Sequence, residues 1–189
     1  MKSTFLVLAL PLTLALACPR VAFSSSSEGV FPLTTKVGDQ LLARNGVGLL
    51  EWGVFSWDLY RAALYVEAPT SDVTQILAVG SSKQLRMHFS RALTQEQMVK
   101  AFTAAFQANA GTPTVELQEH ITRFTQVLTA VRKGDLLVAS YQSSGLLTIE
   151  LNQTRLCSVE SVAFGELFFR LYVGARPPSE ALRRGLLGG

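Results

Sequence analysis

The chain has 189 residues, of which 48% are hydrophobic and 16% are charged. This composition excludes an intrinsically disordered chain, and the length suits one compact domain rather than two. The formal net charge of +3, from 17 basic and 14 acidic residues, is too small to indicate a nucleic-acid-binding protein. Its meaning depends on where along the chain the charges lie.

The first 24 residues have the pattern of a signal peptide. Lys2 precedes an apolar run over residues 5–17, and small residues follow the run. The run is shorter than the roughly twenty residues that cross a bilayer as a helix, so a retained membrane anchor is the less favoured alternative. Cleavage after Ala17 and cleavage near Ser24 both fit the sequence.

Two other interpretations of this segment stay open. In a bacterium, Cys18 would resemble the lipid-attachment site of a lipoprotein. In an alga with complex plastids, the acid-free, serine-rich stretch after the apolar run would resemble the start of a plastid transit segment. The favoured expectation is export, to the periplasm or out of the cell.

Removal of residues 1–24 takes away Lys2 and Arg20 and no acidic residue, which lowers the net charge from +3 to +1. A nearly neutral domain has no electrostatic attraction to nucleic acid or to anionic membranes. Cys157 is then the only cysteine, so the exported fold has no intramolecular disulfide and must be stabilised by its core. We therefore expect no nucleic-acid partner and no stable membrane insertion, whereas the oligomeric state is left open.

A hairpin is predicted near the start of the domain. Residues 36–43 lead into Asn45-Gly46, a dipeptide typical of a tight turn between antiparallel strands. Gly46 and Gly48 form the only glycine cluster. Because the third glycine and the later acidic residue of a dinucleotide fingerprint are missing, the cluster indicates turn geometry.

Two strands with a short helix between them follow. Residues 57–66 are rich in aromatic and aliphatic side chains and predict a strand that is buried on at least one face. A short helix is expected over residues 72–79, with Ser71 as its N-cap and Gly80 at its end. Residues 84–89 alternate between apolar and polar types, which predicts another strand.

Two amphipathic helices come next. Thr94 and Gln97 are placed to form a capping box at the start of the first helix. Residues 111–113 (GTP) break the chain. An apolar stripe at helical spacing then runs from Leu117 to Leu128 and predicts the second helix.

The last third of the domain is predicted to contain three short strands, over residues 136–141, 146–151 and 155–159. A helix over residues 162–173 ends at Gly174, and a final helix runs from Ser179 to near Gly185, where we expect it to dock only loosely. This order of elements predicts an α+β fold, an antiparallel sheet with helices packed on one face.

Few residues could carry out chemistry. His88 and His120 are the only histidines, and neither is spaced from Cys157 as metal ligands are, so we expect no metal site and no cofactor. His120 is predicted to lie on the solvent side of its helix, and Cys157 to be a small buried apolar residue. Asn152 begins a glycosylation triplet, which matters only in a eukaryotic secretory pathway.

Aromatic side chains with polar tips cluster on the strand over residues 57–66. Alternation places Trp57, Arg61 and Tyr65 on one face of the sheet and Tyr60 on the other. A sheet that is covered by helices on one side leaves its other face to water, unless something apolar occupies it, and that face could hold a ligand cleft. The alternative is that these aromatic residues only pack in the core.

Three segments in the right order resemble the chalcone-isomerase-like family. NGVGLLEWGVFSWDLYRAALYVE from Asn45 is similar to its opening strands, and MHFSRALTQEQMVKAF from Met87 is similar to its strand–Arg–helix junction. LYVGARPPSEALRRGLLG from Leu171 resembles its C-terminal signature. The resemblance covers a domain over residues 35–188 and is to the widespread, exported branch rather than to the plant flavonoid enzyme. It implies a curved antiparallel sheet with a ligand cleft between the sheet and its helices.

The resemblance also implies that the catalytic set of the plant enzyme is not kept. The position of its arginine falls on Leu50 or Leu49, that of its strand threonine on Tyr60, and those of its helical tyrosine and asparagine near Pro113 and His120. Fatty-acid-binding relatives keep the arginine and have a tyrosine on the long strand. Tyr60 matches that tyrosine, whereas Leu50 lacks the charge that would pair with a carboxylate.

The expected function is therefore non-catalytic binding of a small apolar or amphipathic molecule, such as a fatty acid or a flavonoid-like compound. Tyr60 is the expected hydroxyl donor, with Leu50, Trp57 and Tyr65 as walls. Structural roles are expected for Arg91 at the strand–helix junction and for three glycines, Gly46, Gly48 and Gly174.

Two alternative functions remain. An isomerase or intramolecular lyase of altered specificity would need a substituted acid, such as Tyr60 or His120, within reach of the substrate. A structural domain that binds a protein partner would instead have a filled cleft. The fold alone does not choose among these functions.

Overall fold

The computed structural model describes residues 29–52 and 57–189 of the chain. The predicted signal peptide over residues 1–24, with Cys18 and both cleavage positions, lies outside the described residues. Within the described ranges, no helix is both long enough and apolar enough to span a membrane.

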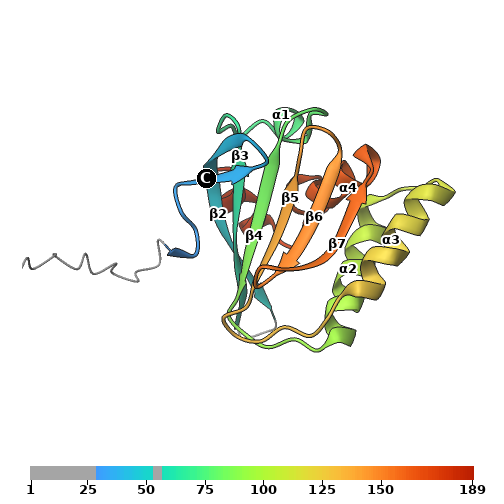
Figure 1. The fold of residues 1–189 in the computed structure, drawn as a ribbon. Helices are drawn as coiled ribbons and strands as arrows, with labels where there is room; N and C mark the ends of the chain where they lie inside the picture. Colours follow the sequence, from blue (N-terminus) through green and yellow to red (C-terminus); the bar gives the residue numbers. More distant parts are fainter. Residues whose placement is uncertain (1–28, 53–56) are drawn as a thin grey trace, which may run out of the picture.

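Seven strands form one sheet in which each strand pairs antiparallel with the next along the chain (Figure 1). They are β1 (Thr34–Val37), β2 (Gln40–Trp52), β3 (Trp57–Val66), β4 (Lys83–Phe89), β5 (Leu136–Tyr141), β6 (Leu146–Leu151) and β7 (Thr154–Glu160). The described part of the chain also contains five helices. These are α1 (Val73–Leu77), α2 (Gln95–Asn109), α3 (Val115–Val127), α4 (Val162–Val173) and α5 (Glu180–Leu186).

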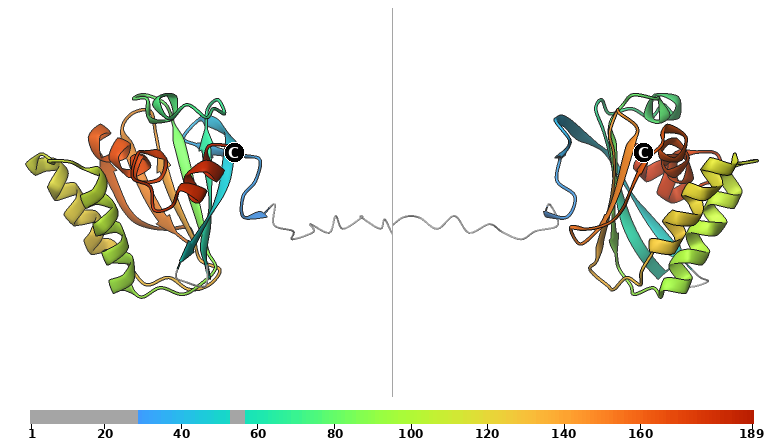
Figure 2. Two further views of the ribbon diagram at one scale, coloured as in Figure 1. Left: turned by 180° about the vertical axis from the view of Figure 1, so that it is seen from behind. Right: turned by 45° about the vertical axis from the view of Figure 1, so that its right-hand side comes forward.

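Helices α2 to α5 lie on the same side of the curved sheet, as the views in Figure 2 show. We call the face that they cover the inner face. Side chains alternate between the two faces along each strand, and those on the inner face are apolar. Ala62 and Leu64 of β3 point to it, as do Leu85 and Met87 of β4. The predicted α+β fold, an antiparallel sheet with helices on one face, is confirmed.

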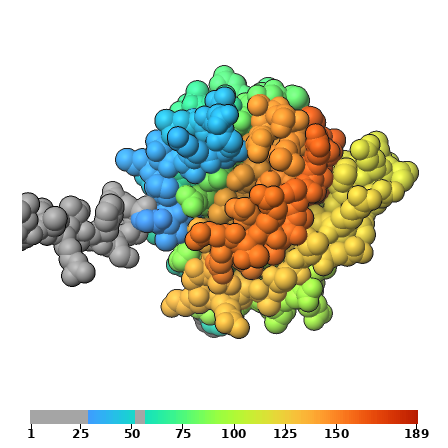
Figure 3. Space-filling view, viewed as in Figure 1, coloured from blue at the N-terminus to red at the C-terminus, as the bar shows by residue number. Residues whose placement is uncertain are grey.

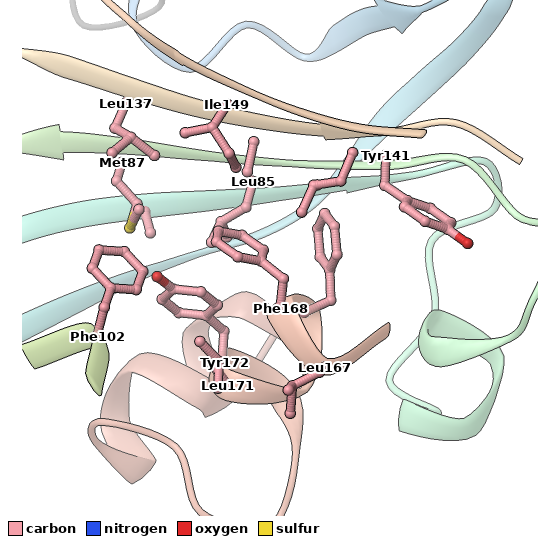
Figure 4. Close-up of a cluster of buried hydrophobic side chains, with 14 of the residues drawn as sticks. Leu85, Met87, Phe102, Leu137, Tyr141, Ile149, Leu167, Phe168, Leu171 and Tyr172 are labelled. Carbon is pink, nitrogen blue, oxygen red and sulfur yellow. The ribbon is translucent and has the colours of Figure 1, made fainter. Parts of the chain in front are cut away.

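Helix α4 supplies a large part of the core. Eight of its twelve residues are buried. The rings of Phe164 and Phe168 pack against Phe124 of α3, with centroids 5.9 and 5.8 Å apart. Figure 4 shows Phe168 reaching from α4 toward Leu85 of the sheet. Helix α4 thereby joins the sheet to helices α2 and α3.

The outer face of the sheet has a smaller apolar cluster near the start of the described chain. Tyr65 and Ala63 of β3 pack there with Leu42 of β2 and with Phe31. Arg44 donates a hydrogen bond to the carbonyl oxygen of Phe31 at 2.6 Å and so holds this segment on the sheet. Figure 3 shows the outer face, with the blue N-terminal segment against the green of β4.

The predicted hairpin at Asn45-Gly46 is wrong. Strands β1 and β2 turn instead at Gly38, whose φ of +57° favours glycine. Strand β2 continues through the glycine cluster, with a bulge between Arg44 and Gly46. Gly46 and Gly48 are therefore needed for a reason other than a turn.

Gly46 and Gly48 allow α5 to lie directly on β2. A Cβ atom at Gly46 would clash with the carbonyl oxygen of Gly185, and one at Gly48 would clash with that of Leu182. Leu182 and Leu186 are both fully buried. The expectation of a loosely docked last helix is therefore wrong, since its backbone packs against the backbone of a strand.

Several other boundaries agree closely with the prediction. The strand over residues 57–66 is β3, and the helix over residues 162–173 is α4 with Gly174 as its C-cap. Thr94 and Gln97 form the predicted capping box at the start of α2. These local signals are confirmed.

Helix α1 is shorter than the predicted range of residues 72–79. Its N-cap is Asp72, whose side chain accepts a hydrogen bond from the backbone N–H of Thr74, rather than the predicted Ser71. The helix ends early because the backbone of Ala78 leaves the helical conformation.

A lysine is buried beneath α1. Lys83 is 1% exposed, and its Nζ donates hydrogen bonds to the carbonyl oxygens of Ile76, at 2.8 Å, and Ala78, at 3.1 Å. The same atom lies 5.1 Å from the ring centroid of Tyr141 and 5.9 Å from that of Phe169. The ammonium thus binds the last carbonyls of the helix while it rests on two aromatic rings.

Replacing Lys83 with Met is expected to change how stability depends on pH. Burial lowers the pKa of Lys83 from 10.5 to about 8, against the opposing effects of Glu166 and Glu67. As the pH rises through 8, the folded protein loses a proton that the unfolded chain still holds, so the folded state is relieved of a buried charge. Between pH 7 and 9.5 the wild type should gain about 2 kcal/mol of unfolding free energy relative to Lys83→Met. Urea unfolding at both pH values measures this gain, and a difference that stays constant with pH would contradict it.

Gly46→Ala is expected to force α5 away from β2. The added methyl group meets backbone atoms that cannot rotate aside, so the unfolding free energy should fall by about 1–3 kcal/mol in urea titrations. Gly29→Ala is the matched control, because a Cβ atom there has nothing within 4 Å. Equal stability of the two variants would show that the contact is not close.

Candidate ligand-binding cavity

An apolar cavity of about 270 Å³ lies between the inner face of the sheet and the helices. Strands β2 to β4 form its floor, α2 forms one wall, and the end of α4 with the loop after it forms the other. Its volume is just below the roughly 300–1,000 Å³ that is typical of small-molecule sites. The lining residues are Leu50, Leu59, Tyr60, Met87, Phe89, Leu93, Met98, Ala101, Phe102, Ala104, Ala105, Ala108, Leu171, Tyr172, Arg176, Pro177 and Pro178.

The cavity exists because α2 presents small side chains toward it. Ala101, Ala105 and Ala108 recur at helical spacing along the wall. Phe102 and Phe106, on neighbouring rows of the same helix, fill the core beside α3 and α4. A methyl group cannot cross the gap that a phenylalanine fills, so unfilled volume remains beside the alanines.

Tyr60 lies in the floor of the cavity. Its pairing partners across the sheet are Leu50 of β2 and Phe89 of β4, and the Phe89 ring is 5.7 Å away between centroids. Burial raises the pKa of the Tyr60 hydroxyl above its usual value, so the group is protonated at neutral pH. Within the described ranges this hydroxyl has no hydrogen-bond partner, and it is free to donate to a ligand.

Tyr172 enters the same cavity from the opposite side, from helix α4. Figure 4 shows its hydroxyl beside Phe102 and Met87, both of which are apolar. Burial, and to a smaller extent the nearby Tyr60, raise the pKa of Tyr172 well above its usual value. Its hydroxyl likewise has no partner among the residues that the structure describes. The interior therefore offers two neutral hydrogen-bonding groups in an apolar surface.

The loop after α4 is tied to the end of α2. The side-chain amide of Asn109 donates to the carbonyl oxygen of Arg176 at 2.9 Å, and Nη1 of Arg176 donates to the carbonyl oxygen of Ala108 at 3.0 Å. Pro177 and Pro178 follow and restrict the backbone further. Arg176 is exposed, so this loop forms the solvent side of the cavity.

The structure separates the four residues that the sequence analysis grouped as ligand contacts. Tyr60 and Leu50 lie next to each other in the cavity. Tyr65 lies in the apolar cluster of the outer face, and Trp57 is 49% exposed at the start of β3. Because side chains alternate along a strand, neither Trp57 nor Tyr65 shares the face of Tyr60.

Arg91 lies where it can join the strands to α2. Its guanidinium is 4.6 Å from the ring centroid of Trp57, a distance typical of a cation–π contact. Arg91 follows β4 and precedes the N-cap Thr94. Arg91 therefore lies at the junction between β4 and α2 and outside the cavity lining.

Two other residues considered for chemistry also lie outside the cavity lining. His120 is not on the solvent side of α3 as expected, because its side chain is 16% exposed and faces Phe164, while its Nε2 lies 3.7 Å from a Glu116 oxygen. Cys157 is partly buried on β7, and burial raises the pKa of its thiol to about 11. Such a thiol is a poor nucleophile at neutral pH.

The side chain of Asn152 is engaged within a turn. It donates to the carboxylate of Asp135 and accepts from the backbone N–H of Leu136, both at 2.9 Å. These contacts occupy the amide that glycosylation would modify. His88 lies on the outer face, with its ring edge-on to Phe31. No group of three potential metal ligands occurs in the described part of the chain.

The protein is thus an α+β domain whose antiparallel sheet and covering helices enclose an apolar cavity. The sequence profile of the chalcone isomerase-like family matches residues 25–188, and the chain belongs to this family. The resemblance seen in the sequence is thereby confirmed. No curated protein sequence matches the chain.

A solved structure with the same fold is that of the fatty-acid binding protein of Arabidopsis thaliana. It is 16% identical in sequence, with a TM-score of 0.68, over 83% of this chain and 90% of that chain. At this identity the similarity shows the shared fold.

Two cavity residues were missed by the sequence analysis. Tyr172 was counted only as part of the last long helix, because an aromatic residue on an apolar helix face gives no sign of an unpaired hydroxyl. Arg176 was read only within a C-terminal signature. Its position depends on α2, whose last turn lies far away in sequence.

Proposed function

We propose that the protein binds a small apolar or amphipathic molecule in this cavity and does not transform it. The observation that carries the proposal is the apolar cavity of about 270 Å³ between the sheet and the helices, which the side chains of Tyr60 and Tyr172 line from opposite sides. An oxygen atom of a ligand can accept a hydrogen bond from either hydroxyl, but the lining is otherwise apolar. A ligand with an apolar body and few oxygens fits best.

Fatty acids and flavonoid-like compounds are the ligand classes that we propose. The related structure from Arabidopsis thaliana is described as a fatty-acid binding protein, which supports the first class. Family membership supports the second. The modest volume favours a medium chain, or a longer chain that extends through the opening.

A binding role is favoured over an isomerase or intramolecular lyase. An effective general acid needs a pKa near the working pH, whereas burial raises the pKa of both Tyr60 and Tyr172. His120, the other candidate acid, does not line the cavity. The partner-binding alternative expects a filled cleft, whereas about 270 Å³ is left unfilled by side chains.

Filling the cavity is expected to abolish binding. Calorimetric titration of the full-length protein with decanoate and with naringenin should show saturable binding of at least one probe. Ala105→Phe places a ring in the cavity wall and should weaken that binding at least 10-fold, whereas Ala130→Phe, at an exposed position off the cavity, should not. Tyr60→Phe should weaken naringenin binding by about 2- to 10-fold, the value of one hydrogen bond.

Thermal unfolding of each variant separates loss of the site from loss of the fold. No saturable binding of either probe to the wild type would refute the proposed function. So would binding that Ala105→Phe leaves unchanged while the variant remains folded.

We also propose that the protein is exported and loses a signal peptide that ends at Ala17 or near Ser24. The support is the charged, apolar and small-residue pattern of the sequence. Intact-mass spectrometry of the protein from its native source should give a mature chain that begins after Ala17 or near Ser24. A lipid adduct on Cys18 would indicate the lipoprotein alternative, and an intact Met1 would exclude export by cleavage.

A further inference from the structure

Among the residues that the structure describes, Arg176 is the only charged one that lines the cavity. It is exposed, whereas Tyr60 and Tyr172 are 7% and 4% exposed. The cavity is therefore polarised, with a cation at the solvent end and neutral hydroxyls in the interior. Ala101, Ala104 and Pro178, which also line it, are exposed as well.

The guanidinium of Arg176 is held in place by one hydrogen bond, and its other N–H groups remain available to a ligand. One nitrogen, Nη1, donates to the carbonyl oxygen of Ala108 at the end of α2, and the backbone of Arg176 accepts from Asn109. Within the described ranges, Nε and Nη2 make no hydrogen bond, and no carboxylate lies within ion-pair distance. A fixed guanidinium with free N–H groups is a suitable partner for a carboxylate or another planar anion.

The interior is a poor place for the same anion. Its polar groups are two phenols that stay neutral, and the remaining surface is apolar. Burial of a carboxylate without a cation carries a large desolvation cost, which two neutral donors do not offset. Leu50, next to Tyr60, supplies no charge.

We infer that the cavity selects amphiphilic anions and binds them apolar end first, with the anionic head at Arg176 on the rim. This inference rests on the proposed function and adds the charge and orientation of the ligand. The apolar tail lies against Tyr60 and Tyr172, whose neutral hydroxyls offer no positive charge to pair with the head group. Charge selection thus occurs at the opening, at a residue of the loop after α4.

The test compares two probes with the same chain, decanoate and 1-decanol, by calorimetric titration. In the wild type, decanoate should bind more tightly than 1-decanol, and added NaCl should reduce this preference. Arg176→Gln keeps a donor for the Ala108 carbonyl but removes the charge. It should weaken decanoate binding by about 3- to 10-fold and leave 1-decanol binding unchanged.

Two further variants complete the test. Arg176→Lys should restore most of the preference for decanoate. Arg123→Gln removes a charge at a 71% exposed position of α3, outside the cavity lining, and should change neither affinity.

The outcomes separate this inference from the proposed function. If neither probe binds to the wild type, the proposed function fails for chain amphiphiles, and the inference fails with it. If both bind and Arg176→Gln leaves decanoate unaffected, or weakens both probes equally, the cavity binds ligands but the inference is overturned. Decanoate binding that depends on Tyr60→Phe and not on Arg176→Gln would place the anionic head in the interior and also overturn it.

Discussion

The packing of α4 against the concave face of the sheet is the contact on which the rest of the structure depends. The phenylalanines of α4 meet those of α2 and α3 in a continuous set of ring contacts, for example Phe106 with Phe164 at 5.8 Å and Phe102 with Phe168 at 6.3 Å between centroids. A fold without an intramolecular disulfide in the described chain needs such a core. The position of α4 then fixes the loop after it and, through that loop, the backbone contact of α5 with β2.

The same packing creates the cavity. Aromatic side chains fill the space under the middle of α4, but the alanines of α2 leave it open toward β2 and β4. In that open part, α4 contributes Tyr172 and the sheet contributes Tyr60, from opposite sides.

The sequence predicted most of the fold because its signals were local. The capping box at Thr94, the stop at Gly174 and the bounds of β3 each depend on a few neighbouring residues. Gly46 was misread because a glycine marks either a turn or a close approach of two backbones, and only the contact with α5 decides between them. That contact joins residues more than a hundred positions apart, beyond the reach of any local pattern.

Only the part of the site that lies on neighbouring strands was predicted from the sequence. Tyr60 and Leu50 came from one strand pair and from the family resemblance, and they do lie together in the cavity. Trp57 and Tyr65 were grouped with them by composition, although the period of a strand already placed them on the other face. Tyr172 and Arg176 come from the other end of the chain. Only the packed helices bring them to Tyr60.

The distribution of polar groups divides the work of binding between two parts of the cavity. Apolar surface contributes roughly 25 cal/mol for each Å² removed from water, so the lining supplies most of the affinity without regard to direction. An exposed arginine adds little free energy because water screens it, but it distinguishes one end of a ligand from the other. A buried arginine beside Tyr60 would carry a desolvation cost in the free protein unless an anion accompanied it. With leucine at position 50 and arginine at position 176, the free cavity avoids that cost, and the charge lies where a water-exposed head group can reach it.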